Sequence, residues 1–557
     1  MNVCEALLEV LSNYGVKYIF GIPGDAINEL IEAIRKQDKI KFIHVMHEEA
    51  GAFAASAQAK LTGELAVCVG TAGPGAIHLL NGLYDAKMDH APVLAITGQV
   101  ETSVIGTGYQ QEVNLLSLFS DVSVFNQTVM NAEQMPELAV LACQTALTRK
   151  GIAHLNIPIN ISSQKVKHVT EKKQVIRNTA VTVPSWDDMQ LAADVINKAQ
   201  KPCILAGIGA KGSVEELVQF AELIQAPIIK ALRGKDLLPD DHPLTLGGIG
   251  LLGTEPSFEA IKHCDVLIII GSDFPYHDFY PEKQIPCVQI DCEADHIGRR
   301  HPVSNPLVGD AGATLRELLP LIAKQDDGVF LSHCQEHMRQ WKKEQDKIES
   351  SNEEPIHPQV LSRTVSDLAQ EDAIICSDTG AVTVWAARNF KIRGEQKFTL
   401  SGGLASMAFG LPAALGAQLI YPDKQVIALC GDGGFAMVMA DFTTAVKYKL
   451  PVKIFIFNNA KLGLIQMEEE ARSGNPEYET GLCDPDYAAF AKICGGEGYT
   501  VKRSVELEPV VRTALNSTHP CIINVFVDPE EITWPPKVTI KEAAQYVKAK
   551  IKELTGK

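Results

Sequence analysis

The stretch from residue 426 to residue 467 limits the possible folds of this chain more than any other. Residues 426–430 form a short apolar run typical of a buried strand, and a Gly-Asp-Gly-Gly turn follows at residues 431–434. Residues 436–448 show helical spacing, and residues 452–457 form a second apolar run. A strand–helix–strand unit of this length predicts a right-handed crossover between parallel strands, whose carboxyl ends meet at one edge of a sheet.

Two oxygen-bearing side chains fall at this predicted edge. Asp432 follows the first strand and Asn459 follows the second. Glycine lets the backbone approach a ligand closely, and a helix N-terminus favours anions. Carboxylate and amide oxygens beside an anion site suit Mg²⁺ or Ca²⁺ that bridges to a diphosphate. The alternative is an ordinary turn with a solvated Asp432, and the Asn458-Asn459 pair that closes the next strand makes this the weaker explanation.

Composition excludes several classes of protein. The chain has 557 residues, which is too long for one core and predicts three or four domains. A net charge of −17 makes nucleic acid an unsuitable partner. The 13 cysteines are scattered without CxxC pairs, which fits buried thiols in a reducing compartment. The N-terminal stretch reads as an amphipathic helix, and no apolar run could span a bilayer, so we expect a cytoplasmic protein.

Strands and helices alternate along most of the chain, which predicts an α/β protein with three doubly wound parallel sheets. We expect the first domain over residues 1–165 and the second over residues 186–330, after a polar linker at residues 172–185. The third domain is expected over residues 358–530. Residues 531–557 form a tail with helical spacing, which we expect to pack on the body, although its lysines could also touch an anionic membrane.

Glu48 is the candidate catalytic residue of the first domain. It follows a predicted strand and opens a helix rich in alanine and glycine, whose small residues allow close packing. The alternative is an exposed glutamate at a helix start, which the helix dipole would favour.

The second domain carries nucleotide-type signals. Gly207 and Gly209 belong to a GxGxxG pattern that follows a strand and precedes a helix. An acidic residue is missing about 20 positions further on, so the pattern is weak as a nicotinamide signal. Asp291 ends a later strand and is placed to accept ribose hydroxyls. The alternative is a nucleotide-type fold without its ligand.

These motifs together resemble thiamine-diphosphate enzymes over nearly the whole chain, and bacterial pyruvate oxidases above all, including their quinone-linked branch. Acetolactate synthases are more distant. The similarity rests on HEEAGAFAASAQAKLTG, GTAGPGAIHLLNGLYDAKMDHAPVLAITG, GSDFPYHDFYP, QIDCEADHIG, TVWAAR and GDGGFAMVMADF. It implies that the carboxyl group of Glu48 hydrogen-bonds to N1′ of thiamine and favours the imino tautomer of its amino group.

The resemblance also implies ligands for thiamine diphosphate and Mg²⁺. Met407 would separate the two thiamine rings, and the Ala405 carbonyl would accept a hydrogen bond from the amino group. The metal would be held by Asp432, the Asn459 side chain and the Lys461 carbonyl. The implied thiamine-diphosphate contacts are Glu48, Ala405, Ser406, Met407, Asp432, Gly433, Gly434, Asn459, Lys461, Leu462, Gly463, Leu464 and Ile465.

The middle segments resemble those of flavin-containing members and imply bound FAD. The implied FAD contacts are Gly207, Gly209, Ile249, Gly250, Leu251, Leu252, Gly271, Ser272, Asp273, Phe274, Pro275, Asp291 and Asp310.

The activity implied by this resemblance is oxidative decarboxylation of pyruvate or another small 2-oxo acid through an intermediate bound at C2 of thiamine. Electrons would pass to FAD and then to a quinone or O₂, and the products would be CO₂ with acetate or acetyl phosphate. The family also implies a homo-oligomer, typically a tetramer, with active sites between subunits.

Two positions near the expected substrate leave a second activity open, and a third counts against it. Gln110 and Leu464 stand where pyruvate oxidases usually have aromatic residues, and Glu468 stands where acetolactate synthases usually have tryptophan. The alternative activity is an acetolactate synthase-type carboligation in which FAD is only structural. A further alternative, a non-catalytic relative that binds the cofactors, is disfavoured because Glu48, Met407, Asp432 and Asn459 are all present.

Overall fold

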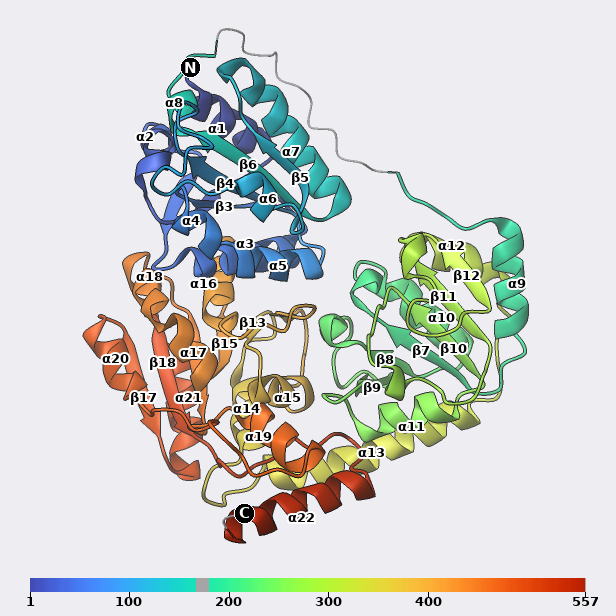
Figure 1. Cartoon of the computed structure of the whole chain (residues 1–557). Coiled ribbons are helices and arrows are strands. Elements are labelled where there is room, and N and C mark those ends of the chain that lie inside the picture. Colours follow the sequence, from blue (N-terminus) through green and yellow to red (C-terminus); the bar gives the residue numbers. More distant parts are fainter. Residues whose placement is uncertain (167–179, 556–557) are drawn as a thin grey trace.

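The computed structural model describes residues 1–166 and 180–555. These residues form three domains, each built on a six-stranded parallel sheet, so the predicted α/β class with three doubly wound sheets is confirmed (Figure 1). Most of the predicted linker at residues 172–185 lies outside the described residues.

The first domain has the strand order β2-β1-β3-β4-β6-β5. Its strands are β1 (Tyr18–Gly21), β2 (Lys41–His44), β3 (Ala66–Gly70), β4 (Val93–Gln99), β5 (Ser123–Thr128) and β6 (Ile152–Pro158). Its helices are α1 (Val3–Asn13), α2 (Asn28–Arg35), α3 (Glu48–Thr62), α4 (Pro74–His78), α5 (Leu80–Met88), α6 (Leu115–Leu118), α7 (Met135–Arg149) and α8 (Ile159–Ser162).

The central domain has the order β12-β11-β10-β7-β8-β9. Its strands are β7 (Pro202–Ala206), β8 (Ile228–Lys230), β9 (Thr245–Gly248), β10 (Val266–Ile270), β11 (Cys287–Asp291) and β12 (Asn305–Val308). Its helices are α9 (Trp186–Ile196), α10 (Val214–Leu223), α11 (Glu255–His263) and α12 (Ala311–Leu318), and the long α13 (Val329–Glu349) connects it to the third domain.

The third domain has the order β14-β13-β15-β16-β18-β17. Its strands are β13 (Ile374–Ser377), β14 (Lys397–Leu400), β15 (Val426–Gly431), β16 (Lys453–Asn458), β17 (Glu497–Val501) and β18 (Cys521–Phe526). Its helices are α14 (Pro358–Leu368), α15 (Ala381–Arg388), α16 (Gly410–Ile420), α17 (Asp432–Val438), α18 (Phe442–Lys447), α19 (Gly463–Met467), α20 (Tyr487–Ile493) and α21 (Ser504–Leu515).

The helix predicted over residues 436–448 begins earlier and is broken in two. α17 starts at Asp432, and a 3₁₀ turn over Met439–Asp441 separates it from α18. Val438 leaves helical geometry with φ −129° and ψ 17°. A tertiary contact holds this turn, because the buried Asp441 carboxylate accepts a hydrogen bond from the Met46 amide of the first domain at 2.8 Å.

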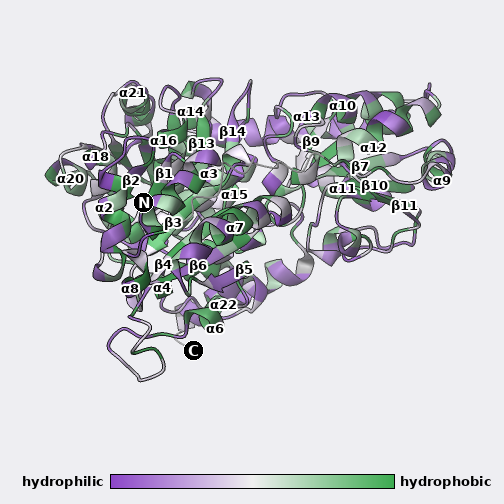
Figure 2. Ribbon diagram, turned by 90° about the horizontal axis from the view of Figure 1, so that it is seen from above, coloured by the Kyte–Doolittle hydropathy of each residue, from purple (hydrophilic) through white to green (hydrophobic). Residues whose placement is uncertain are grey.

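The first and third domains pack through α3 and α16, which lie side by side (Figure 1). A Cβ atom on Gly416 would lie 2.4 Å from the carbonyl oxygen of Ala54, so the two helices approach at backbone distance. Hydrophobic colour is concentrated around β1, β3 and α3, and hydrophilic colour follows the outer loops (Figure 2). The small residues of α3 therefore serve close domain packing, as the sequence predicts.

The tail forms helix α22 (Ile540–Thr555), which packs on the π-helical segment Glu468–Arg472 as we expected. Lys550 pairs with the buried Glu470 at 2.8 Å, and Trp534 packs edge-on against Tyr546. Within the described part of the chain, no helix has both the length and the apolar character needed to cross a bilayer.

Replacing Asp441 by asparagine is expected to stabilise the protein at pH 8. Burial raises the pKa of Asp441 from 3.8 to about 6, so the stability contributed by its protonated form is lost as the pH rises through about 6. Asp441→Asn keeps the acceptor for Met46, and its free energy of unfolding at pH 8 should exceed the parent's by about 2–3 kcal/mol. Denaturant unfolding at pH 8 and pH 4 tests this: the gain should fall to about 0.5 kcal/mol at pH 4, close to the unfolded-state pKa, and a variant that is less stable at pH 8 would contradict it.

Candidate active site

Three neighbouring strands of the third sheet bring the predicted residues together. β13, β15 and β16 are adjacent, so the loops at their carboxyl ends share one edge of the sheet. A cavity of about 310 Å³ opens at this edge. The predicted residues that line it are Ala405, Met407, Asp432, Gly433, Gly434, Asn459, Lys461, Leu462, Gly463, Leu464 and Ile465.

Asp432 is the acidic centre of this cavity. Its side chain is buried, Oδ1 accepts a hydrogen bond from the Gly433 amide at 3.0 Å, and Oδ2 has no hydrogen-bond partner among the described residues. Burial raises the pKa of Asp432 to about 6. A buried carboxylate oxygen without a partner is costly, and a bound cation would remove that cost. Asp432 therefore fits the predicted metal ligand.

The loop after β16 supplies the other two predicted ligands. Asn459 lines the cavity, and its Oδ1 accepts a hydrogen bond from the Lys461 amide at 3.2 Å. The ammonium group of Lys461 pairs with Glu477 at 3.1 Å and with Glu530 at 2.8 Å. This leaves the main chain of Lys461 as its available ligand, as the resemblance implies.

The loop after β13 is part of the same site, although we did not predict its residues as ligands. Thr379 and Gly380 line the cavity. Asp378 lies beneath it: a Cβ atom on Gly434 would be 2.3 Å from Asp378 Oδ2, so only glycine fits at residue 434. Burial raises the pKa of Asp378 to about 7, and its Oδ2 has no partner among the described residues. The sequence signal was present, because Asp-Thr-Gly directly follows a predicted strand.

Met407 reaches the glycine turn from the loop before α16. Its methyl carbon would lie 3.4 Å from a Cβ atom on Gly433, so it sits over the turn inside the cavity. Ala405 holds a left-handed conformation with φ 56° and lines the same cavity. Ser406 instead accepts a hydrogen bond from Asn81 of the first domain at 3.0 Å.

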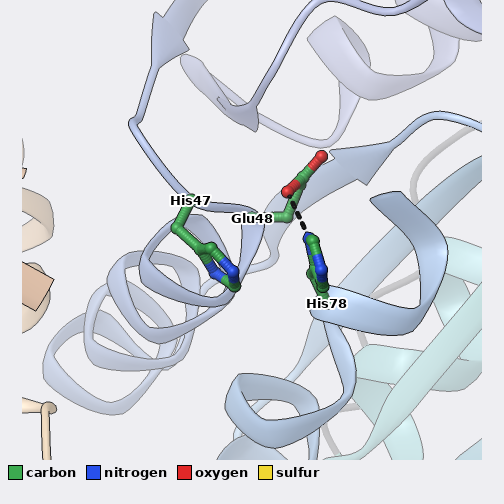
Figure 3. Close-up of side chains that lie close together, drawn as sticks. All are labelled: His47, Glu48 and His78. Atoms are coloured by element: carbon green, nitrogen blue, oxygen red, sulfur yellow. Dashed lines mark hydrogen bonds and ion pairs between the residues drawn. The ribbon is translucent and has the colours of Figure 1, made fainter. Parts of the chain in front are cut away.

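Glu48 begins helix α3, and its side chain is buried. Its Oε2 lies 3.0 Å from Nδ1 of His78, a residue that sequence reasoning did not single out although it lies in the matching segment GPGAIH (Figure 3). The ring of His47 stacks on that of His78 with centroids 4.3 Å apart. His47 also caps α3, because its Nδ1 accepts the Glu49 amide hydrogen at 3.2 Å. Glu48 is thus held by a hydrogen bond at the start of a rigid helix.

The residues around Glu48 do not line the cavity that contains Asp432. Among the described residues that line the 310 Å³ cavity, Glu48 and His78 are missing. Met46, two residues before Glu48, and Ile77, next to His78, are exposed, as are Ile465, which lines the cavity, and Met437 of α17. Both halves of the predicted thiamine site therefore present apolar side chains to solvent.

The predicted FAD residues lie mainly at the carboxyl edge of the central sheet. β11, β10 and β7 are adjacent, which places Asp291, Gly271 and Gly207 side by side. Close packing explains Gly207 and Gly209, because a Cβ atom on either would lie within 2.7 Å of the Gly271 backbone. Ser272 has a buried hydroxyl group with no hydrogen-bond partner among the described residues. A ligand bound at this edge would supply that partner.

Other predicted FAD residues also have partners within the protein. Asp273 forms a bidentate salt bridge with Arg300, whose Nε and Nη2 donate hydrogen bonds to the two carboxylate oxygens at 2.7 and 3.0 Å. Asp310 caps α12 by accepting the Ala313 amide hydrogen at 2.9 Å. Gly250 has φ 88°, and a side chain there would meet Phe274, which packs in the domain core with Ile249. Pro275 follows this aromatic residue in the loop after β10.

Residues 249–252 link the central domain to the helix behind the cavity. Arg388 at the end of α15 donates hydrogen bonds to the carbonyls of Leu251 and Gly253, and Leu252 packs on the core of the third domain. The first residue of α15, Ala381, lines the cavity. One helix therefore contacts both the cavity and the loop predicted to hold FAD.

Of the three predicted substrate residues, one lines the cavity. Leu464 lines the cavity, whereas Gln110 is exposed on a loop of the first domain. Glu468 pairs with Arg472 at 3.2 Å at the start of the π-helical segment. The structure thus brings only Leu464 to the cavity within one chain.

The fold and the site define an α/β protein of three parallel sheets, with a buried carboxylate and a glycine turn at the carboxyl edge of the third sheet. Three family models match the chain: the N-terminal TPP binding domain of thiamine pyrophosphate enzymes at residues 1–118, their central domain at residues 189–318, and their C-terminal TPP binding domain at residues 378–525.

Several curated proteins are similar to this chain over most of its length. It is 44% identical to the protein YdaP of Bacillus subtilis, over 98% of this chain and 95% of that one. It is 32% identical to pyruvate oxidase of Lactiplantibacillus plantarum, over 91% and 85%. It is 30% identical to the large subunit of acetolactate synthase isozyme 2 of Escherichia coli, over 96% and 97%. The chain belongs to the thiamine pyrophosphate enzyme family and is an enzyme that depends on this cofactor.

Proposed function

We propose that this enzyme oxidatively decarboxylates pyruvate, or another small 2-oxo acid, with Mg²⁺ and FAD in addition to thiamine diphosphate. The products would be CO₂ with acetate or acetyl phosphate, and a quinone or O₂ would accept the electrons. The observation that carries the proposal is the buried, unpartnered Asp432 oxygen in a cavity joined through α15 to the central domain. The similarity to pyruvate oxidase of Lactiplantibacillus plantarum supports the choice of reaction.

The residues around the cavity would bind the diphosphate end of the cofactor. Asp432, Asn459 and the Lys461 main chain offer the oxygen ligands that Mg²⁺ prefers. Gly433 and Gly434 have no side chains, so the diphosphate can approach the backbone closely there. A side chain at residue 434 would also meet Asp378. When bound, thiamine diphosphate supplies an electron sink for decarboxylation, and FAD accepts two electrons.

Glu48 would act on the pyrimidine end of the cofactor. Its hydrogen bond with His78 engages Oε2, so we assign Oε1 to the pyrimidine nitrogen. The position of Glu48 at the start of α3 fixes this carboxyl group before the cofactor arrives. Proton exchange between Glu48 and that nitrogen would make the neighbouring amino group basic, which is general acid–base catalysis.

A second copy of the chain would complete the site. Glu48 does not line the Asp432 cavity within one chain, and four apolar residues from the segments that carry the two halves are exposed: Met46, Ile77, Met437 and Ile465. Burying such residues favours association. We therefore propose a dimer as the smallest active unit and a homotetramer in solution, located in the cytoplasm with at most peripheral contact to its membrane.

Acetolactate synthesis is the second candidate. Gln110 is exposed and Leu464 is aliphatic, so the aromatic pair usual in pyruvate oxidases is missing at both positions. The similarity to acetolactate synthase isozyme 2 of Escherichia coli supports this candidate as well. In that reaction FAD would have only a structural role.

Product analysis separates the two candidates. The enzyme loaded with thiamine diphosphate, Mg²⁺ and FAD is incubated with pyruvate and a soluble quinone or O₂, with and without phosphate. We expect one CO₂ and one acetate or acetyl phosphate for each acceptor molecule reduced. Acetolactate as the only product, with no acceptor reduced, would refute the oxidative reaction.

A further inference from the structure

The loop over residues 401–407 holds a conformation that its sequence does not favour. Ala405 has φ 56°, and Ala408, directly after the loop, has φ 73°. Left-handed geometry at residues other than glycine persists only where the surrounding structure enforces it. Because Ala405 and Met407 line the cavity, whatever enforces this geometry also shapes the site.

Asp89 of the first domain binds the start of this loop with both carboxylate oxygens. Oδ2 accepts the Gly402 amide hydrogen at 3.0 Å, and Oδ1 accepts the Gly403 amide hydrogen at 2.8 Å. The side chain of Asp89 is only 3% exposed. Hydrogen bonds to a buried charged group are stronger than neutral ones, so this is a firm attachment.

Two cations from different domains hold the Asp89 carboxylate in place. Lys60 of α3 lies 2.6 Å from Oδ2 and also donates to the Leu400 carbonyl at 3.0 Å. Arg233 of the central domain lies 3.2 Å from Oδ1. Burial alone would raise the pKa of Asp89, but Lys60 and Arg233 outweigh it and keep the pKa below its ordinary value. All three domains therefore meet at one charged group.

Steric fit makes this contact specific. A Cβ atom on Gly402 would lie 2.4 Å from Cγ of Arg233, and one on Gly403 would lie 2.8 Å from the Met88 carbonyl oxygen. The loop thus approaches Asp89 at backbone distance. No other residue type fits either position without movement of its neighbours.

We propose that Asp89 is a positioning residue that holds the 401–407 loop in its cofactor-binding geometry, and that Arg233 extends this control to the central domain. The proposal rests on the assignment of Ala405 and Met407 to the thiamine site. Asp89 and Arg233 do not line the cavity among the described residues, so they would act only through the loop.

Hydrogen exchange in the cofactor-free protein tests the attachment itself. In Asp89→Asn, peptides that contain Gly402 and Gly403 should exchange about 10- to 100-fold faster than in the parent, because the charged acceptor is lost. Asp121→Asn is the matched control, since Asp121 pairs with Lys87 of α5 but is 71% exposed. Unchanged exchange in a folded Asp89→Asn protein would overturn the proposal.

Loading the variants with thiamine diphosphate and Mg²⁺ tests the consequence. At saturating cofactor, deuterium exchange at C2 of thiamine, followed by NMR, should be about 10- to 100-fold slower in Asp89→Asn than in the parent or the Asp121→Asn control. Equal rates would overturn the positioning role. This exchange precedes substrate chemistry, so failure of the parent to oxidise pyruvate would refute the proposed reaction without touching this inference.

Arg233→Met makes the same test if Asp89→Asn does not fold. This substitution keeps Asp89 and Lys60 and removes only the guanidinium group that the central domain contributes to the Asp89 carboxylate. We expect severalfold faster exchange at residues 402–403 and severalfold slower exchange at thiamine C2. Parent-like values in both measurements would overturn the link to the central domain.

Discussion

Replacing Glu48 by glutamine is expected to lower turnover of pyruvate by about 10²- to 10⁴-fold, the range of general acid–base catalysis. Glutamine keeps the size of the side chain but cannot exchange a proton with the pyrimidine nitrogen. The hydrogen bond at Oε2 with His78 can be kept, so the fold should be unaffected. Turnover at saturating thiamine diphosphate, with the melting temperature measured in parallel, is the test.

Glu49→Gln is the matched control for this prediction. Glu49 is the next residue of α3, and its carboxylate accepts a hydrogen bond from Asn81 at 2.6 Å, which glutamine can also accept. Its turnover should stay within about threefold of the parent, as expected for a substitution outside the chemistry. Parent-like turnover in Glu48→Gln would remove Glu48 from the mechanism.

Asp432→Ala is expected to abolish stabilisation by the cofactor while leaving the free protein folded. The cavity loses the buried oxygen that would bind the cation, so the affinity for thiamine diphosphate with Mg²⁺ should fall by about 100-fold or more. For the parent, cofactor at about 100 times its dissociation constant should add about 2.7 kcal/mol to the free energy of unfolding. Thermal unfolding with and without cofactor measures the difference.

The cofactor-free Asp432→Ala protein should be no less stable than the parent at pH 8, because it no longer buries an unpartnered carboxylate. Asp423→Ala removes the same charge from an exposed position just before β15 and should respond to cofactor as the parent does. A cofactor-induced shift that survives in Asp432→Ala would exclude this residue as a metal ligand.

The sequence predicted the elements of this site better than their contacts. Asp432 and Asn459 could be placed at one edge because each directly follows a strand, and carboxyl ends of adjacent parallel strands meet. Asp378 follows a third such strand but was not recognised as part of the site, because nothing local shows that Gly434 packs against it.

Contacts between distant segments explain what the sequence could not show. The 3₁₀ turn that breaks the helix after Val438 contains Asp441, which bonds to Met46, nearly 400 residues earlier in the chain. The attachment of Gly402 to Asp89 likewise joins two domains. Helical spacing and turn motifs report only local preference, and tertiary contact overrides it at these points.

Anaerobic mixing with pyruvate tests the proposed reaction most directly. The protein loaded with thiamine diphosphate, Mg²⁺ and FAD is mixed rapidly with pyruvate, and the band of oxidised flavin near about 450 nm is followed. We predict rapid bleaching with release of one CO₂ per flavin. A band that persists while acetolactate forms would contradict oxidative decarboxylation and assign the enzyme to the carboligases, and a protein that retains no flavin would contradict our assignment of the central domain.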